Sequence, residues 1–186
     1  MDRAHGAHGA HAAPRADGVD GRADFDFEVG RWKVESRRLM APLQGATEWE
    51  TFVGIAESRK VLGGLGIIDE ITNERPSGRT QGMTLRLFDP QSRQWTIYFA
   101  GHAQGVLVGL LQGVFTPPLI GGFTSGRGVF YGHEFIDGPS GGKHLYTRYL
   151  WSDITPTTYR WEQAFSADGG ASWETNWIQE HSKLQG

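Results

Sequence analysis

The chain has 186 residues, of which 38% are hydrophobic and 21% charged, and a formal net charge of −3. This length fits one domain with a short additional segment, and a mildly acidic chain without a dense run of Lys or Arg argues against nucleic-acid binding. The chain contains no cysteine, which excludes disulfides, a thiolate nucleophile and Cys-ligated metal centres. No apolar stretch approaches the ~20 residues of a transmembrane helix or forms the core of a signal peptide. We therefore expect a cytoplasmic protein without a membrane partner.

Residues 1–24 differ in composition from the rest of the chain. They include no aromatic residue, leucine or isoleucine and carry His5, His8 and His11 within Ala/Gly repeats. Such a segment cannot bury enough apolar surface to offset the entropy that is lost on ordering. We expect a disordered tail at residues 1–24, which binds metal ions only incidentally through its histidines, and a folded domain at residues 25–186.

From Phe25 onward the pattern is that of short strands separated by turns. Turn residues such as Asp168-Gly169-Gly170 divide the chain, and no segment has the apolar period of a three-turn helix. About ten short strands joined mainly by hairpins predict an all-β protein, either a closed antiparallel barrel or a sandwich. The candidate strands lie near residues 31–40, 47–58, 66–73, 80–89, 94–100, 118–124, 127–136, 143–152, 158–166 and 172–182.

The last hairpin has the clearest alternation of apolar and polar residues. A three-residue turn at 168–170 would pair Phe165 with Trp173 and Trp161 with Trp177. We expect the largely aromatic face to point into the barrel and the other face, with Asn176, to meet water, although a β-bulge could reverse one end. The inward face would carry Tyr159, Trp161, Gln163, Phe165, Trp173, Thr175, Trp177, Gln179 and His181.

The first hairpin follows the same reasoning. A loop at residues 41–46 would place Arg38 opposite Glu48 or Glu50. Such a cluster is either a buried ion pair or a group that binds a carboxylate or positions a proton. The strands at 83–88 and 95–100 are apolar on both faces, so their pattern does not orient them. The shared face of the first strand would carry Trp32, Val34, Ser36, Arg38 and Met40.

Gly30-Arg31-Trp32 places a G-x-W tripeptide at the start of the first strand. With DFDFEVGRWKVESRRL, VLGGLGIIDE, GMTLRLFDPQSRQWTIY and LWSDITPTTYRWEQAFSADGGASWETNW, it makes residues 24–182 resemble an uncharacterised bacterial family with a lipocalin-like (calycin-like) barrel. The resemblance implies an antiparallel β-barrel of about eight to ten strands whose closed end is filled by Trp32. The family has no general activity, so the resemblance implies a fold and no function.

Two segments depart from the family pattern. Where family members read W-x-M-x-F, this chain reads Trp177-Ile178-Gln179-Glu180-His181, which makes two inward positions polar. Residues 101–116 combine aliphatic residues with glycines. They form either a lid over the barrel or an extra strand or short helix packed on it.

Catalytic motifs are absent from the sequence. It contains no G-x-S-x-G elbow, phosphate-binding loop or dinucleotide fingerprint, and the histidines of the folded part lack metal-ligand spacing. We expect no metal site and no cofactor, with haem held by the inward His181 as the alternative. The segment from Ser166 to Trp173 matches the S-x-D-x-G-x-x-W turn known as the Asp-box, which we expect to stabilise the hairpin without a catalytic role.

A barrel of this size can hold one small ligand between its inward side chains. We expect binding of a small, largely apolar molecule; the alternative is a cofactor-independent cyclase or isomerase acting on a small hydrophobic, natural-product-like substrate in the same cavity, with His181, Arg38 and Glu50 as catalytic residues. A packed barrel that works through its surface is a third interpretation. The sequence identifies neither the ligand nor the oligomeric state. The expected ligand-binding residues are Arg38, Tyr98, Tyr159, Trp161, Gln163, Trp177, Gln179 and His181.

Overall fold

The computed structural model describes residues 20–103, 106–108, 118–136 and 142–185. Within these ranges the chain forms three 3-10 turns, η1 (Gly21–Ala23), η2 (Asp26–Glu28) and η3 (Leu62–Gly64), and otherwise strands and loops. The strands are β1 (Gly30–Leu39), β2 (Trp49–Val61), β3 (Gly66–Arg75), β4 (Gly78–Asp89), β5 (Gln94–Ala103), β6 (Val106–Val108), β7 (Leu119–Thr124), β8 (Arg127–Ile136), β9 (Lys143–Ser152), β10 (Thr158–Ser166) and β11 (Glu174–Lys183). The prediction of an all-β protein is confirmed.

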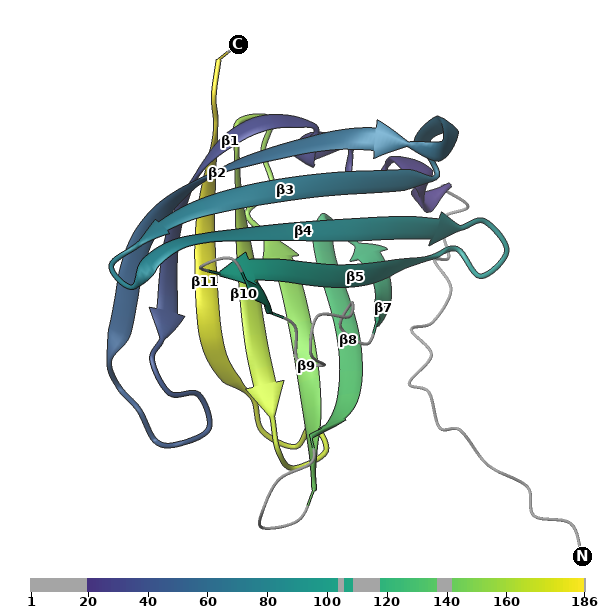
Figure 1. Cartoon of the computed structure of the whole chain (residues 1–186). Coiled ribbons are helices and arrows are strands. Elements are labelled where there is room, and N and C mark those ends of the chain that lie inside the picture. The colour runs from purple at the N-terminus through teal and green to yellow at the C-terminus, as the bar shows by residue number, and fades with distance from the viewer. Residues whose placement is uncertain (1–19, 104–105, 109–117, 137–141, 186) are drawn as a thin grey trace, which may run out of the picture.

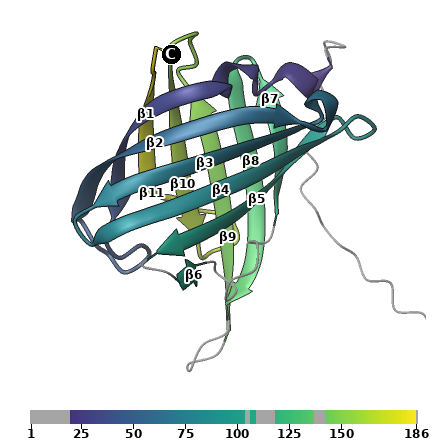
Figure 2. The ribbon, with the colours of Figure 1, turned by 45° about the horizontal axis from the view of Figure 1, so that its top comes forward.

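The strands form one antiparallel sheet that closes on itself. The ring runs β1-β2-β3-β4-β5-β7-β8-β9-β10-β11, and β11 pairs back with β1. In Figure 1, β3, β4 and β5 cross in front of β8 to β11, and Figure 2 shows the same two layers after rotation. The structure is therefore the predicted closed barrel and not a sandwich. The short β6 pairs with the end of β5, so this part of 101–116 is an extra strand; residues 104–105 and 109–116 lie outside the described residues.

Period-two alternation places one face of each strand inside the barrel. On β1, Trp32, Val34 and Ser36 are buried while their neighbours are exposed. Arg38 pairs in register with Glu50, which confirms the predicted first hairpin and selects Glu50 over Glu48. Met40 follows the end of β1 and is exposed, so it does not extend the inner face.

Aromatic side chains fill the closed end of the barrel. The Phe25 ring lies 4.8 to 5.7 Å, centroid to centroid, from the rings of Phe123, Trp95, Trp151 and Phe130. The indole Nε1 of the fully buried Trp32 donates a hydrogen bond to the Glu28 carbonyl oxygen at 2.7 Å. Trp32 thus packs at this end, as the G-x-W tripeptide predicts.

The folded chain begins before Phe25, so the expected tail boundary at residue 24 is too late. Gly21 is buried, and its carbonyl oxygen accepts a hydrogen bond from Trp95 Nε1 at 3.0 Å. A Cβ at Gly21 would lie 2.9 Å from Asp24 Oδ2 and 3.0 Å from the Phe88 ring, so a larger residue would force these side chains to shift. Residues 20–24 therefore belong to the closed end, and residues 1–19 of the expected tail lie outside the described residues.

The structure also orients the two strands whose sequence pattern was ambiguous. Arg86 and Phe88 on β4, and Trp95 and Ile97 on β5, are buried inside the barrel, and the residues between them are half-buried. The sequence pattern did not orient these strands because the outer residues Met83, Leu85 and Leu87 of β4 are also apolar. In addition, one inner position of β4 is a charged residue, Arg86.

The last hairpin differs from its predicted register by two residues. Tyr159 pairs with His181 and Gln163 with Trp177, and the register then shifts by one residue, which leaves Asn176 unpaired. Beyond this bulge the faces reverse. Trp173, predicted inward, packs outside against Arg148, whose guanidinium carbon lies 4.9 Å from its ring centroid.

The turn of this hairpin explains the error in register. Asp168 Oδ1 accepts a hydrogen bond from the Ser172 backbone N–H at 2.9 Å, and Ser166 Oγ accepts one from the Gly170 N–H at 2.8 Å. These bonds hold a loop from Ala167 to Trp173 between the strands, so the connection is longer than the three residues that the prediction assumed. The Asp-box thus stabilises the hairpin, as expected.

Candidate functional site

Polar side chains interrupt the aromatic inner wall of the barrel. They lie on β1, β3, β4 and β11, and the register of these strands turns them inward. Each has one polar atom that is buried and has no hydrogen-bond partner among the described residues. An unpaired buried polar atom costs about 1–3 kcal/mol, so such atoms in a folded protein need water or a ligand as partner. The atoms are Ser36 Oγ, Asn73 Oδ1, Thr84 Oγ1, Trp177 Nε1 and His181 Nδ1.

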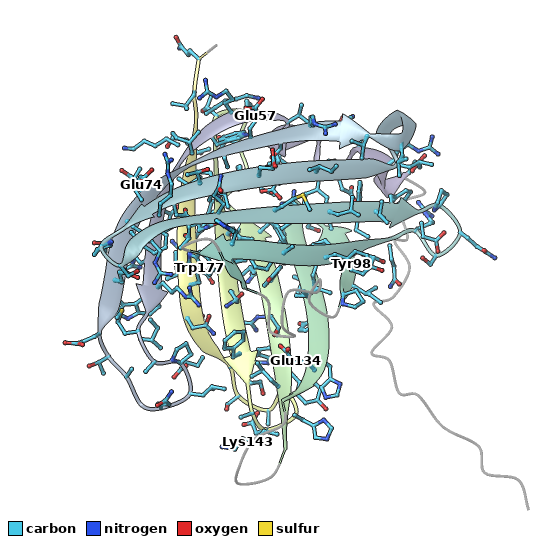
Figure 3. All side chains as sticks on the ribbon, viewed as in Figure 1. Glu57, Glu74, Tyr98, Glu134, Lys143 and Trp177 are labelled. Atoms are coloured by element: carbon cyan, nitrogen blue, oxygen red, sulfur yellow. The ribbon has the colours of Figure 1, made fainter. Side chains whose placement is uncertain are left out.

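The inner wall also keeps surface that solvent can reach. Trp161, Trp177, Phe99 and Thr84 are half-buried although the register places them inside the barrel. Their neighbours therefore do not fill the interior at these positions, which speaks against the packed-barrel interpretation. Figure 3 shows the described side chains on the barrel and labels Trp177 among them.

His181 presents a neutral imidazole to the interior. Its ring stacks on Tyr159 with the centroids 4.0 Å apart, and its Nε2 lies 3.2 Å from Gln179 Oε1. Because the amide oxygen can only accept, Nε2 carries the proton and Nδ1 offers an unpaired lone pair. Burial, with a smaller effect from the charge of Arg86, lowers the pKa of His181 to about 3.

The bulge brings Asn176, which the alternation had placed outside, to the inner side. Gln163 Nε2 donates a hydrogen bond to Asn176 Oδ1 at 2.7 Å, and both side chains are buried. Asn176 Nδ2 in turn donates to the Glu174 carbonyl oxygen at 3.3 Å. Gln163 is therefore inward, as predicted, and already engaged in a polar pair.

The far end of the barrel, opposite Phe25, holds a cluster of charged and aromatic side chains. Arg75 forms a part-buried ion pair with Glu50, while the Arg38 guanidinium lies over the Trp177 ring, 4.8 Å from its centroid. Partial burial, and then the charge of Arg75, lowers the pKa of Arg38; Glu50 acts in the opposite direction. The Trp177 ring also contacts Phe52 at 6.2 Å.

A second charged cluster lies at the closed end and is structural. Arg86 pairs with Glu28 and lies 3.3 Å from Asp69, and Trp151 Nε1 donates to the Glu28 carboxylate. Burial raises the pKa of Glu28, and the charge of Arg86 offsets part of this rise. The cluster ties η2 to β3, β4 and β9, and so anchors the segment that closes the barrel.

One expected ligand-binding residue does not belong to the site. Tyr98 lies between the buried Ile97 and the inward Phe99, opposite Leu85 in register, so its side chain faces the outside of the barrel. The sequence analysis did not identify Asn73, Arg75 and Thr84 as residues of the inner wall. Asn73 and Arg75 share one face of β3 with the buried Ile67. Alternation along residues 66–75 would have placed both inside the barrel if the inward face of this strand had been known.

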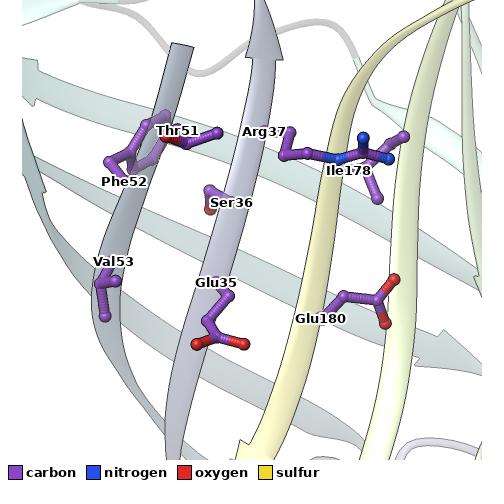
Figure 4. A pocket seen from close by; sticks show the side chains of 8 residues that line it. All are labelled: Glu35, Ser36, Arg37, Thr51, Phe52, Val53, Ile178 and Glu180. Atoms are coloured by element: carbon purple, nitrogen blue, oxygen red, sulfur yellow. The ribbon is translucent and has the colours of Figure 1, made fainter. Parts of the chain in front are cut away.

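One groove of the described surface has a lining that includes Ser36 and Phe52 of the inner wall. It has a volume of about 350 Å³ and lies over β1, between β2 and β11. Figure 4 shows its lining, in which Glu35, Arg37 and Glu180 belong to the outer face. The groove therefore shares Ser36 and Phe52 with the inner wall, but no charged residue with the cluster at the far end.

Within the described ranges, no group of three or more His, Asp or Glu side chains is arranged to hold a metal ion. The same ranges contain no helix that is long and apolar enough to cross a membrane. The exposed pair His133 and His144, with Nε2 and Nδ1 2.7 Å apart, lies on β8 and β9.

The fold makes this a closed antiparallel β-barrel protein with a polar and aromatic inner wall. Residues 22–115, half of the chain, match the model of the family described as "Protein of unknown function (DUF1579)", and the protein belongs to this family. No curated protein matches the sequence.

Solved structures show similarity of fold at low sequence identity. EF1p2_mFAP2b bound to DFHBI is 9% identical, with a TM-score of 0.43 over 89% of this chain and 100% of that chain. The S-type phycobiliprotein lyase CPES from Guillardia theta is 10% identical, with a TM-score of 0.47 over 93% of this chain and 99% of that chain.

Proposed function

We propose that the protein binds a small, largely apolar molecule against the inner wall of the barrel. The observation that carries this proposal is the row of unpaired polar atoms, from Trp177 Nε1 to His181 Nδ1, set between half-buried aromatic rings. An apolar pocket with a few placed polar groups is the usual composition of a small-molecule site.

The side chains of the inner wall have different roles in this proposal. Trp161 and Trp177, whose ring centroids lie 5.7 Å apart, supply contact area for the apolar body of the ligand. Ser36 Oγ and His181 Nδ1 supply hydrogen bonds that fix its orientation. Tyr159 and Gln179 hold the imidazole in place and act on the ligand through it.

The lowered pKa of His181 and the ion pair of Glu50 favour binding over the cyclase or isomerase alternative. A general base works best when its pKa lies near the working pH, whereas the pKa of His181 is lowered to about 3, which makes its imidazole a weak base. Glu50 is engaged by Arg75. The groups proposed for catalysis are thus better suited to hold a ligand than to move its protons.

The proposal is tested with N-phenyl-1-naphthylamine, a neutral aromatic probe whose fluorescence rises on leaving water. We expect saturable binding of one probe per chain, weakened about tenfold by Trp161→Leu, since an aromatic contact contributes about 0.5–1.5 kcal/mol beyond area burial. The matched control is Trp49→Leu, because Trp49 lies on the outer face of β2. If Trp161→Leu does not fold, Trp161→Phe is measured in its place.

The control separates the inner wall from the outer one. Probe binding that is lost in Trp49→Leu and kept in the Trp161 variants would place the probe on the exposed strip of Trp49, Val53 and Ile55 and contradict the proposal. Failure of the folded wild-type protein to bind the probe would contradict it as well.

A further inference from the structure

The cluster of Arg38, Arg75 and Glu50 at the far end of the inner wall has more hydrogen-bond donors than acceptors. The buried Glu134 of β8 lies on the same wall, and burial raises the pKa of its carboxyl. Arg38 and Arg75 bring two guanidinium groups to it, and Glu50 brings one carboxylate, which Arg75 occupies. Among the described residues, Arg38 forms no ion pair or hydrogen bond; its contact is with the face of the Trp177 ring. The cluster therefore carries one positive charge without a counter-charge.

The indole of Trp177 adds a second unsatisfied donor at the same place. Its Nε1 is buried and has no partner within the described part of the chain. Trp177 pairs in register with Arg38, so the two donors project from neighbouring positions of adjacent strands. An indole N–H and a guanidinium can only donate, so both need a group that accepts.

From these two donors we infer that the ligand of the barrel carries an anionic acceptor group of the carboxylate class, which binds Arg38 and Trp177 Nε1; this inference rests on the proposed binding function. A carboxylate matches the fork of a guanidinium with two parallel hydrogen bonds and has lone pairs left for the indole. One negative charge neutralises the one unbalanced cation of the cluster.

The position of the two donors also sets the orientation of the ligand. Trp177 contacts Trp161, which in turn lies 4.9 Å from Tyr149. An anion at Arg38 places an attached ring system against these aromatic side chains, deeper in the barrel. The ligand class is therefore an aromatic or aliphatic monocarboxylate with its charged group at the far end.

The inference is tested with two probes that share one ring system. 1-Naphthaleneacetate carries the carboxylate, and 1-naphthaleneacetamide replaces it with a neutral amide of the same shape. Isothermal titration of the full chain should show the acid binding at least tenfold more tightly than the amide, which corresponds to about 1.4 kcal/mol. The difference should shrink at high salt, because ions screen a partly exposed charge.

A matched pair of variants locates the effect. Arg38→Gln should reduce the preference for the acid to less than threefold. Arg37→Gln should leave it unchanged, since Arg37 stacks on Trp49 on the outer face as Arg38 stacks on Trp177 on the inner face. Trp177→Phe keeps a ring but removes the N–H, and it should also weaken binding of the acid. This variant tests the inference if Arg38→Gln does not fold.

The outcomes separate this inference from the proposed function. Equal affinity for acid and amide, or an acid preference that survives Arg38→Gln in the folded protein, overturns the anionic ligand while binding in the barrel stands. Binding of N-phenyl-1-naphthylamine without binding of either naphthaleneacetate derivative also overturns the anionic ligand and leaves binding in the barrel intact. If none of the three probes binds, the proposed function itself is contradicted.

Discussion

The buried imidazole of His181 should make the stability of the barrel depend on pH. Its pKa is lowered to about 3 in the folded protein, against about 6.5 in an unfolded chain. Below about pH 6.5 the unfolded chain binds a proton that the folded protein does not bind, so the free energy of unfolding falls as the pH falls. This loss continues until the pH reaches the folded pKa.

The magnitude follows from the shift. Each pKa unit corresponds to 1.36 kcal/mol, so His181 alone should lower the free energy of unfolding by about 2 kcal/mol between about pH 6.5 and pH 5. For a domain of this size that equals about 4–8 °C in melting temperature. Other titrating groups contribute to the same curve, and comparison with a variant that lacks the imidazole removes most of their effect.

Urea unfolding of the wild type and of His181→Phe at several pH values between 7 and 5 measures this contribution. The wild type should lose about 2 kcal/mol relative to the variant over this range. Gln179→Met is the control: it removes the partner of His181 Nε2 and lowers stability, but it keeps the imidazole and so the pH dependence. Parallel curves for wild type and His181→Phe would refute a buried neutral imidazole.

Two further predictions concern the closed end. Glu28→Gln leaves the buried Arg86 with only Asp69 as counter-charge, so it should lower the free energy of unfolding by about 3 kcal/mol in urea titration. A change below about 1 kcal/mol would contradict the structural role of this cluster. Gly121→Ala should lower the melting temperature by several degrees, because the new Cβ would overlap the Val129 carbonyl oxygen. Gly122→Ala should leave the melting temperature unchanged, because the space around its Cβ is open. Equal effects of the two variants would contradict the close approach of β7 and β8.

The sequence predicted the parts of the barrel in which alternation is regular. On β1, polar outer residues alternate with Trp32, Val34 and Ser36. The inward phase of this strand followed from that pattern, whereas the choice of Glu50 over Glu48 as the partner of Arg38 came from the structure. On β10 and β11 the same reasoning identified Tyr159, Trp161, Gln179 and His181 as inward residues, although the assumed turn was too short.

The remaining parts depended on features that alternation does not encode. The bulge at Asn176 comes from the length of the Asp-box turn and reverses the face of Trp173. Tyr98 was assigned inward although the sequence pattern did not show which face of its strand points into the barrel, and the register places it outside. The pairing of Arg75 with Glu50 joins residues 25 positions apart, and only closure of the sheet brings this pair beside Trp177.

The indole N–H signals of the tryptophans test most directly whether a ligand binds inside the barrel. Four of them donate hydrogen bonds within the protein, from Trp32, Trp95, Trp151 and Trp173, and Trp49 lies on the outer wall. In a ¹H–¹⁵N spectrum recorded with and without N-phenyl-1-naphthylamine, we expect the signals of Trp161 and Trp177 to shift and those of the other five to stay. Shifts of Trp49 or Trp173, with Trp161 and Trp177 unchanged, would show that the molecule binds outside and would contradict a binding site on the inner wall.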